Sequence, residues 1–333
     1  MKNIANLRGA KMNYRKTGKD LTVSSISFGC MGMTHTFGVA ADKAEMTRVL
    51  HGAVERGHTM FDTAEVYISD DGSDEHNEDL VGEALKPYRN KIKIATKFGI
   101  AFGKNGFIYD VRPEKIRSSL ETSLKRLQTD YIDVYYLHRY NPEDSIEDVA
   151  GVMAELIKEG KILNWGLSVV GEEVIRRAHK VCPLTAIQNH YSMLNRDSEQ
   201  LFPVLEELGI GLVSYSPLDK GFLSAAYDKN TVFPKDDWRS RMPYFETGMD
   251  ANKALIDALR SKAAEKNATS AQISLAWIIG KKPFIVPIPG TRNFDRMNEN
   301  AGAADVVLTP EEIEGFDVLL DSANFLGLKN ARF

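Results

Sequence analysis

The sequence predicts an α/β fold, a (β/α)8 barrel of the TIM type with an N-terminal β-hairpin cap and long substrate loops. Short runs of β-branched and aromatic residues alternate with segments of helical periodicity from the beginning of the chain to its end. Eight such strand–helix units can be counted, and this number favours a closed barrel over an open sheet. No Gly-, Ser- or Pro-rich linker divides the chain, so one domain is expected to span residues 1–333.

The first half of the chain begins with the expected hairpin cap, AKMNYRKTGKDLTV, which turns at residues 17–20, and continues with the first barrel strand at 24–29. The first helix has a start signal in Asp42, an N-cap residue with Glu45 three positions later, and Gly57 is expected to end it. Pro113 is a typical residue for the first turn of the third helix. The other strands and helices of this half are expected, in alternation, at 58–62, 74–88, 92–97, 112–127, 132–137 and 146–159.

The second half continues the same alternation. Strands are expected at 162–168, 184–188, 210–216 and 284–290, and helices at 171–180, 197–209, 251–266, 270–280 and 309–320. Residues 217–250 form an irregular segment that is too long for an ordinary connection, which makes it a candidate substrate loop. Substrate specificity is also expected in the loop at 100–112 and in the tail at 323–333.

Composition narrows the classes of function. The net charge of −4 provides no basic surface for nucleic acid, so no nucleic-acid partner is expected. With two cysteines a disulfide framework is not supported, and a reducing, cytoplasmic location is expected. The N-terminus is polar and no apolar run reaches the roughly 20 residues of a membrane span, so no membrane association is expected. The spacing of the His and Cys residues is not that of a zinc site, so no metal is expected. The simplest expected assembly is a monomer or a weak homo-oligomer.

Four residues of different chemistry mark the expected ends of the strands. Asp62, Lys97 and His138 end the runs HTMFD, KIKIATK and IDVYYLH, and Tyr67 follows in the loop DTAEVY. Taken singly, an Asp–Lys pair is more often structural, and a His near an apolar strand is usually part of the core. Because the carboxyl ends of barrel strands converge, however, the four side chains are expected to form one proton-transfer site.

With these residues in place, the chain resembles the aldo-keto reductase superfamily over nearly its full length. FDTAEVY, IATKFG and YYLHR resemble the motifs that carry the family's catalytic Asp and Tyr, Lys, and His. NWGLS, AIQNHYSMLNR, LVSYSPLDKGFL and IPGTRNFDRMNEN resemble its cofactor-binding segments in the same order. The resemblance implies a barrel that binds NADP(H) in an extended pose without a Rossmann domain, and the chain has no G-x-G-x-x-G fingerprint.

The resemblance also assigns roles to residues of the expected cofactor site. The end of the first strand is implied to contact the ribose and nicotinamide side, and Tyr215 to stack on the nicotinamide ring. Ser168 and Gln188 match the pair that binds the carboxamide, although many members have Ser-Asn where this chain has Ser168-Val169. The remaining implied contacts are, in chain order, Gly29, Cys30, Met31 and Asp62 near the nicotinamide, Ser216, Leu218 and Gly221 over the pyrophosphate, and Gly290, Thr291, Arg292, Arg296, Glu299 and Asn300 at the adenosine-phosphate end.

The implied reaction explains why these residue types are needed. Hydride reduction of a carbonyl leaves negative charge on oxygen, which requires a proton donor or hydrogen bonds. Tyr67 is the expected donor, with Lys97 lowering the pKa of the phenol and Asp62 balancing Lys97. His138 is expected to orient the carbonyl oxygen. The sequence therefore predicts an NADPH-dependent oxidoreductase that acts on a small-molecule aldehyde or ketone.

Several alternatives stay open from the sequence. An NADP(H)-sensing regulatory subunit that resembles the potassium-channel β-subunits would keep the same four residues, and a metal-dependent barrel hydrolase would need ligand clusters that are not evident. Arg292 and Arg296 could be a solvated helix start instead of a phosphate site, and Cys30 could be a reactive thiol. The aromatic residues Trp238, Tyr244 and Phe245 could line a substrate pocket or pack the long loop.

Overall fold

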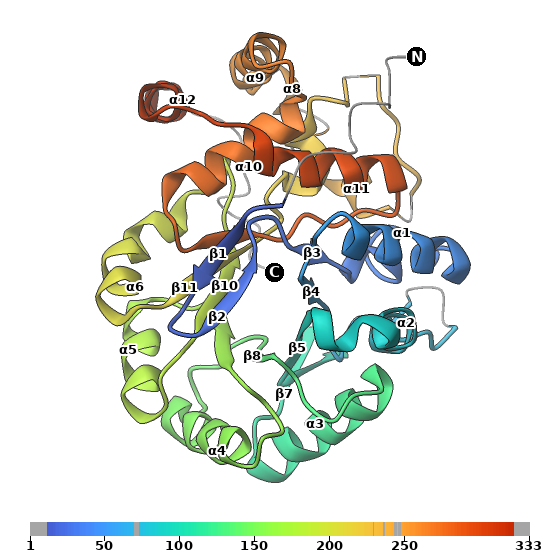
Figure 1. The fold of residues 1–333 in the computed structure, drawn as a ribbon, viewed down its shortest axis with the longest axis vertical. Coiled ribbons are helices and arrows are strands. Elements are labelled where there is room, and N and C mark those ends of the chain that lie inside the picture. Colours follow the sequence, from blue (N-terminus) through green and yellow to red (C-terminus); the bar gives the residue numbers. More distant parts are fainter. Residues whose placement is uncertain are drawn as a thin grey trace.

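The computed structural model describes residues 12–69, 73–104, 106–228, 230–235, 237–242, 245 and 248–322. Eight strands form one sheet in the order β12-β11-β10-β9-β8-β5-β4-β3, and every neighbouring pair is parallel. Two hydrogen bonds close the sheet into a barrel, from Ser27 N to Pro287 O (3.0 Å) and from Gly29 N to Pro289 O (3.4 Å). Helices surround the strands (Figure 1). The predicted (β/α)8 barrel is therefore confirmed.

The strands are short, as is usual where a sheet curves into a barrel. The barrel strands are β3 (Phe28–Gly29), β4 (Met60–Asp62), β5 (Lys93–Phe98), β8 (Val134–Leu137), β9 (Trp165–Ser168), β10 (Ala186–His190), β11 (Gly211–Tyr215) and β12 (Ile285–Pro287). Two antiparallel hairpins lie outside this sheet, β1 (Tyr14–Thr17) with β2 (Leu21–Ser24), and β6 (Ile100–Gly103) with β7 (Gly106–Tyr109).

The helices follow the predicted alternation. The α-helices are α1 (Lys43–Glu55), α2 (Asn77–Leu85), α3 (Pro113–Leu127), α4 (Ile146–Lys158), α5 (Glu172–Val181), α6 (Phe202–Leu208), α8 (Gly248–Ala251), α9 (Lys253–Glu265), α10 (Ser270–Lys281), α11 (Phe294–Ala301) and α12 (Pro310–Ser322). The 3-10 turns are η2 (Met31–Met33), η3 (Lys86–Lys91), η4 (Asp197–Leu201), η5 (Asp219–Ser224), η6 (Trp238–Arg241) and η7 (Gly302–Asp305). Within the described residues, no helix is both long and apolar enough to cross a lipid bilayer.

Local sequence signals explain where several elements begin and end. The Asp42 side chain accepts a hydrogen bond from Glu45 N at the start of α1, as the N-cap pattern predicts. Pro87 follows α2, and the chain continues there as a 3-10 turn instead of the predicted longer helix. The structure differs from the prediction most clearly after β5, where Ile100–Gly103 (β6) and Gly106–Tyr109 (β7) pair as a hairpin instead of forming a loop. Predictions for residues 1–11, Tyr244 and 323–333 lie outside the described residues.

The barrel interior is filled by apolar side chains that the strands point inward. Its cluster comprises Leu21, Val23, Met60, Ala95, Val134, Tyr136, Ala186, Val213, Val286 and Ile288. Leu21 and Val23 come from β2, so the N-terminal hairpin contributes to the interior as the predicted cap. A larger apolar cluster fills the layer between strands and helices. The barrel interior is thus a packed core and not an open channel.

Close contacts attach the β1–β2 hairpin to the last third of the chain. The Arg15 guanidinium donates hydrogen bonds to the carbonyls of Ile279 (2.6 Å), Lys282 (2.9 Å) and Ile285 (3.2 Å). Gly211 permits the closest approach, because a Cβ at this position would lie 1.7 Å from Thr17 Oγ1. The hairpin is therefore locked against the amino-terminal end of β11.

We expect Gly211→Ala to destabilise the fold, because the added methyl group has no space beside the buried Thr17 side chain. The free energy of unfolding should fall by about 1–3 kcal/mol, as in other overpacked cores. The matched control is Gly315→Ala in α12, where a Cβ would meet nothing within 4 Å. It should leave stability unchanged or raise it by up to about 1 kcal/mol. Urea denaturation of both variants measures the difference, and equal stabilities would contradict the close-contact explanation.

Candidate active site

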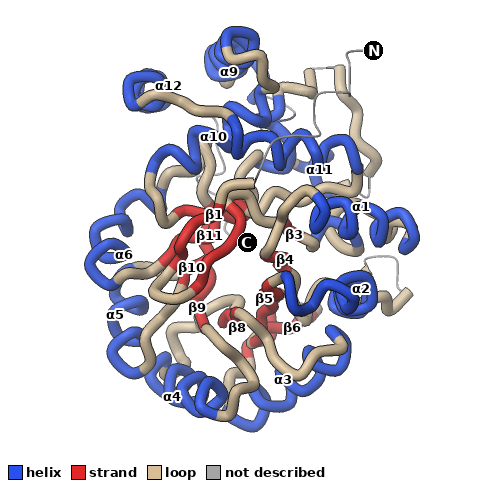
Figure 2. The backbone as a smooth tube through the Cα atoms, viewed as in Figure 1, coloured by secondary structure: helices blue, strands red, loops and turns tan. Residues whose placement is uncertain are grey.

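The four predicted catalytic residues meet at the carboxyl-terminal end of the barrel. Asp62 is the last residue of β4, Lys97 lies near the end of β5 and His138 directly follows β8. Tyr67 lies in the loop after β4. In the sheet register Asp62 is opposite Ala95 and Lys97 is opposite Tyr136, so these neighbouring strands end at a common level. Figure 2 shows the barrel strands side by side inside the ring of helices.

A fully buried ammonium group is the centre of this cluster. Lys97 Nζ donates hydrogen bonds to Asp62 Oδ1 (2.5 Å), Thr63 O (2.7 Å) and Tyr67 Oη (3.2 Å). Burial alone would lower the pKa of Lys97, but the charge of Asp62 and the contact with Tyr67 outweigh it, and the pKa is raised. The lysine is therefore a fixed cation with three acceptors.

The Tyr67 phenol is buried and keeps its proton. Burial raises its pKa, and the opposing effect of the nearby Lys97 ammonium is smaller. The sequence analysis expected the ammonium to lower this pKa, but desolvation of the phenol has the larger effect here. Tyr67 is consequently a protonated donor at neutral pH, held 3.2 Å from the cation that would stabilise its phenolate.

His138 is a neutral imidazole next to the phenol. Its ring lies edge-on to Tyr67, with ring centroids 5.7 Å apart at an interplanar angle of 83°. Burial, followed by the charges of Lys97 and Arg139, holds the pKa of His138 well below its ordinary value. Among the described residues, His138 Nδ1 finds no hydrogen-bond partner although it is buried. A buried polar atom of this kind fits a site that a ligand completes.

Gln188 and Ser168, the expected carboxamide contacts, lie on neighbouring strands in the same buried region. Gln188 Nε2 donates a hydrogen bond to Asp62 Oδ2 (2.7 Å), so the amide holds the Asp62 carboxylate from across the barrel. Ser168 Oγ lies 3.4 Å from Arg139 Nη1, which also donates to His138 O (2.9 Å). Val169 has a left-handed backbone with φ 56° and is 44% exposed. Arg139 was not predicted, although its position directly after His138 was a visible signal.

Tyr215 is the last residue of β11, and its ring packs on a hydrogen-bonded group formed by His190, Asp219 and Ser192. Its ring stacks on His190, with centroids 5.3 Å apart at 17°. His190 Nε2 lies 3.0 Å from Asp219 Oδ1, and Ser192 Oγ donates to Asp219 Oδ2 (2.5 Å). Asp219 is fully buried at the start of η5, so this set joins Tyr215 to the segment expected over the pyrophosphate. His190 and Asp219 were not predicted, because no local pattern links residues 29 positions apart.

That segment, which contains Ser216, Leu218 and Gly221, has an unusual backbone. Positive φ angles occur at Ser216 (49°), Asp219 (45°), Lys220 (56°) and Gly221 (96°). Burial lowers the pKa of Lys220 to about 8. Strained backbone of this kind, here next to the Lys220 side chain, is found mainly at functional sites.

The two arginines of the expected adenosine-phosphate end have different environments. Arg292 donates to the carbonyls of Gly32 and Val39 (2.9 Å to the latter), so its guanidinium holds the segment after β3. Arg296 is exposed near the amino-terminal end of α11, and its nearest partner is Tyr227 Oη at 3.5 Å. The sequence predicts equivalent roles for Arg292 and Arg296, because the backbone partners of Arg292 cannot be recognised from the sequence.

The other expected contacts at this end surround the first turn of α11. Thr291 Oγ1 accepts a hydrogen bond from Asn293 N (3.1 Å), and Glu299 O accepts one from Gln272 Nε2 (2.9 Å). Asn300 is buried. Gly290 and Gly29 bring the ends of β12 and β3 together, since a Cβ on Gly290 would lie 2.5 Å from Gly29 O. These glycines leave backbone, without side chains, at the mouth of the barrel, where an extended ligand can approach closely.

Two alternatives from the sequence can be evaluated. Cys30 is fully buried, and burial raises the pKa of its thiol, which disfavours a reactive thiolate. Phe245 is buried against Phe222, Tyr227 and Phe233 and therefore packs the long loop, whereas Trp238 is 39% exposed. Met31, next to Cys30, packs against the apolar cluster that contains Tyr67 and Ile100. Within the described ranges, no group of three or more His, Cys, Asp or Glu side chains could hold a metal ion.

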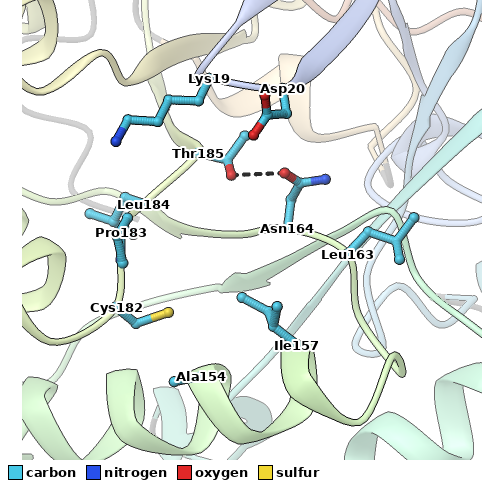
Figure 3. A pocket seen from close by; sticks show the side chains of 10 residues that line it. All are labelled: Lys19, Asp20, Ala154, Ile157, Leu163, Asn164, Cys182, Pro183, Leu184 and Thr185. Carbon is cyan, nitrogen blue, oxygen red and sulfur yellow. Dashed lines mark hydrogen bonds between the residues drawn. The ribbon is translucent and has the colours of Figure 1, made fainter.

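A separate hollow of about 310 Å³ lies at the other end of the barrel (Figure 3). It is lined by the hairpin turn residues Lys19 and Asp20 and by residues that precede β9 and β10, with Thr185 Oγ1 bonded to Asn164 Oδ1 (2.9 Å). None of the four predicted catalytic residues lines it. The hollow is therefore distinct from the candidate active site.

Comparison with known proteins identifies relatives of the whole chain. The sequence model of the Aldo/keto reductase family matches residues 25–321. A protein named probable aldo-keto reductase 1, from Glycine max, is 39% identical over 294 residues, which cover 87% of this chain and 84% of that protein.

Solved structures agree with this match. The glycerol dehydrogenase of Gluconobacter oxydans superimposes with a TM-score of 0.84 at 26% identity, covering 96% of this chain and 98% of that one. An aldo/keto reductase of Klebsiella pneumoniae, solved in complex with NADP and acetate, has a TM-score of 0.72 at 25% identity, with coverages of 93% and 96%.

We expect His138 to remain neutral between about pH 6 and 8, where an ordinary imidazole with a pKa near 6.5 titrates. Because its pKa is lowered in the folded state, its contribution to stability is complete above about pH 6.5 and is lost as the pH falls below that value. NMR titration of the imidazole signals, with His138→Gln to assign the signal, measures this. The urea-unfolded chain is the control, and a folded-state pKa for His138 near 6.5 would refute the neutral assignment.

Proposed function

Because the chain belongs to the aldo/keto reductase family, we propose that it reduces the carbonyl group of a small aldehyde or ketone with NADPH. The observation that carries this proposal is the buried Lys97 ammonium bonded to both Asp62 and Tyr67 at the end of the barrel strands. A cation fixed beside a protonated phenol is suited to proton transfer to an oxygen that gains negative charge. We further propose that the chain acts as one domain, as expected from the sequence.

The residues of the cluster have separate tasks in this proposal. NADPH, when bound, supplies the hydride. Tyr67 donates its proton to the carbonyl oxygen, and the Lys97 ammonium stabilises the resulting phenolate. Asp62 keeps Lys97 charged and in position, with its second oxygen held by Gln188. The neutral His138 orients the carbonyl oxygen, because an uncharged imidazole can contribute a hydrogen bond without competing for the proton.

The cofactor is proposed to extend from the catalytic cluster to α11. Tyr215, supported by His190, would stack on the nicotinamide ring. Ser168, the Oε1 atom of Gln188 and Arg139 would bind the carboxamide, with Arg139 compensating for the amide that Val169 lacks. Gly29, Cys30 and Met31 would line the nicotinamide ribose, and the segment from Ser216 to Gly221 would cover the pyrophosphate. Gly290, Thr291, Glu299 and Asn300 would surround the adenosine end.

The proposal assigns the 2′-phosphate of NADP(H) to Arg296 in particular. Arg296 is exposed at a helix N-terminus, a favourable place for an anion. Arg292 would contribute indirectly, because its guanidinium already holds the carbonyls of Gly32 and Val39. NADPH is therefore expected to bind more tightly than NADH.

We expect Tyr67→Phe to lower aldehyde reduction by roughly 10²–10⁴-fold, because the ring stays and the proton donor is lost. NADPH affinity should remain close to that of the wild type. The measurement is NADPH oxidation over a panel of aldehydes, together with NADPH binding, and Tyr14→Phe on the exposed strand β1 is the control. Near-normal turnover by Tyr67→Phe would assign the proton to another group. A wild type that binds NADPH but reduces no carbonyl would favour the regulatory-subunit alternative.

We expect Arg296→Ala to weaken NADPH binding by roughly ten- to a hundredfold, since hydrogen bonds to charged groups contribute about 1.5–3 kcal/mol. NADH affinity should change little. In contrast, Arg292→Ala should weaken both cofactors, because it releases the segment after β3. Arg48→Ala is the control, a guanidinium that lies 4.4 Å from the Phe294 ring of α11 but is bonded to Glu45. Isothermal titration with both cofactors measures these effects, and equal losses of NADPH and NADH for Arg296→Ala would exclude the phosphate assignment.

A further inference from the structure

The β6–β7 hairpin is an added element above the active site. It begins two residues after Phe98, the last residue of β5, and pairs only with itself in a two-stranded sheet within the described residues. The strand that carries Lys97 therefore leads directly into it. A two-stranded hairpin gains little stability on its own, so its composition reflects what it packs against.

The register divides the hairpin into two faces. Residues that are directly paired across an antiparallel sheet point to the same side. Ile100 pairs with Tyr109 and Phe102 with Phe107, which places these four on one face. Ala101 pairs with Ile108 on the opposite face. One side of the hairpin thus presents three aromatic rings, which we call the aromatic face (Ile100, Phe102, Phe107 and Tyr109).

Ring contacts connect the aromatic face to the catalytic phenol. The ring centroids of Phe107 and Phe102 lie 5.6 Å apart, and those of Phe102 and His35 lie 5.4 Å apart. The His35 ring is nearly parallel to Tyr67, with centroids 6.0 Å apart at 15°. His35 Nδ1 is 3.0 Å from Ile68 O, which holds the imidazole in this orientation. The rings form a continuous path from His138 and Tyr67 to the outer edge of the hairpin.

The outer part of this path is open to solvent although it is apolar. Phe102 is 55% exposed and Tyr109 is 40% exposed, whereas Ile100 at the inner end is buried in the apolar cluster that contains Tyr67. Exposed aromatic rings that adjoin a polar site are typical of a ligand-binding surface, because ligand binding removes their apolar area from water. Their flat shape selects a flat partner.

We propose that the aromatic face and His35 form the substrate wall, against which a planar aromatic group of the carbonyl substrate stacks. This rests on the proposed reductase function and names its substrate class, aryl or conjugated aldehydes and ketones. The carbonyl oxygen meets Tyr67 and His138 while the ring of the substrate lies beside Phe102. His35, held parallel to Tyr67, continues the stack between the two.

The test compares an aryl with an alkyl substrate. For Phe102→Ala, kcat/KM for 2-naphthaldehyde should fall about tenfold, and kcat/KM for propanal should stay within about twofold of the wild type. Phe102→Tyr keeps the ring and should retain the aryl preference. Ile108→Ala removes an exposed apolar side chain from the opposite face of the same hairpin and should leave both substrates unchanged. Equal losses for both aldehydes, or none for naphthaldehyde, would overturn the proposal.

A binding measurement separates this inference from the proposed function. 2-Naphthamide is flat and is not reduced by hydride under these conditions, so its dissociation constant can be determined by calorimetry without turnover. We expect Phe102→Ala to weaken 2-naphthamide binding about tenfold and Phe102→Tyr to restore it. If the wild type reduces neither aldehyde but this pattern holds, the reductase proposal fails and the aromatic wall stands. If naphthamide binds equally to wild type and Phe102→Ala, the wall is refuted whatever the turnover.

Discussion

The buried ammonium of Lys97 is the constraint on which the site depends. A charge removed from water requires compensation, and Lys97 receives it from Asp62, the Thr63 carbonyl and Tyr67. Asp62 in turn is held by Gln188 from β10, which lies across the barrel. Three strands, β4, β5 and β10, must therefore end at matching levels before the charge is compensated. The strand positions that close the barrel therefore also place the partners of Lys97, and a misplaced strand would disrupt both the barrel and the site.

The balance between burial and neighbouring charge also determines the pKa of the Tyr67 phenol. The sequence predicts that the nearby ammonium lowers the pKa of Tyr67, yet desolvation has the larger effect and the pKa rises. The same desolvation keeps His138 neutral. A site that holds both groups in their uncharged forms, beside the Lys97 ammonium and the Arg139 guanidinium, is organised to stabilise negative charge that develops on a ligand oxygen. For Tyr67 and His138 burial has a larger effect on the pKa than the neighbouring charges, whereas for Lys97 the contacts with Asp62 and Tyr67 outweigh burial.

Features that depend on residue periodicity and on the positions of strand ends could be predicted from the sequence. The barrel, the cap at Asp42 and the convergence of Asp62, Lys97 and His138 all follow from short-range patterns combined with the geometry of parallel strands. The β6–β7 hairpin escaped prediction because its glycines and polar turn resemble a loop. The partners of Arg292 escaped because they are backbone carbonyls about 250 to 260 positions away in the chain. The His190–Asp219 pair joins the end of β10 to the start of η5, and no local spacing reveals it. The specific roles of the predicted site residues remain proposals.

The docking of the first hairpin has a consequence for biosynthesis. The Arg15 and Thr17 side chains contact segments beyond residue 210, in the last third of the chain. A nascent chain leaving the ribosome therefore carries the hairpin, with the apolar Leu21 and Val23, long before its docking surface exists. The N-terminal segment must wait in solvent or be shielded by a chaperone, and barrel completion becomes a late, post-translational step. Moving this hairpin to follow the last helix by circular permutation would shorten that wait.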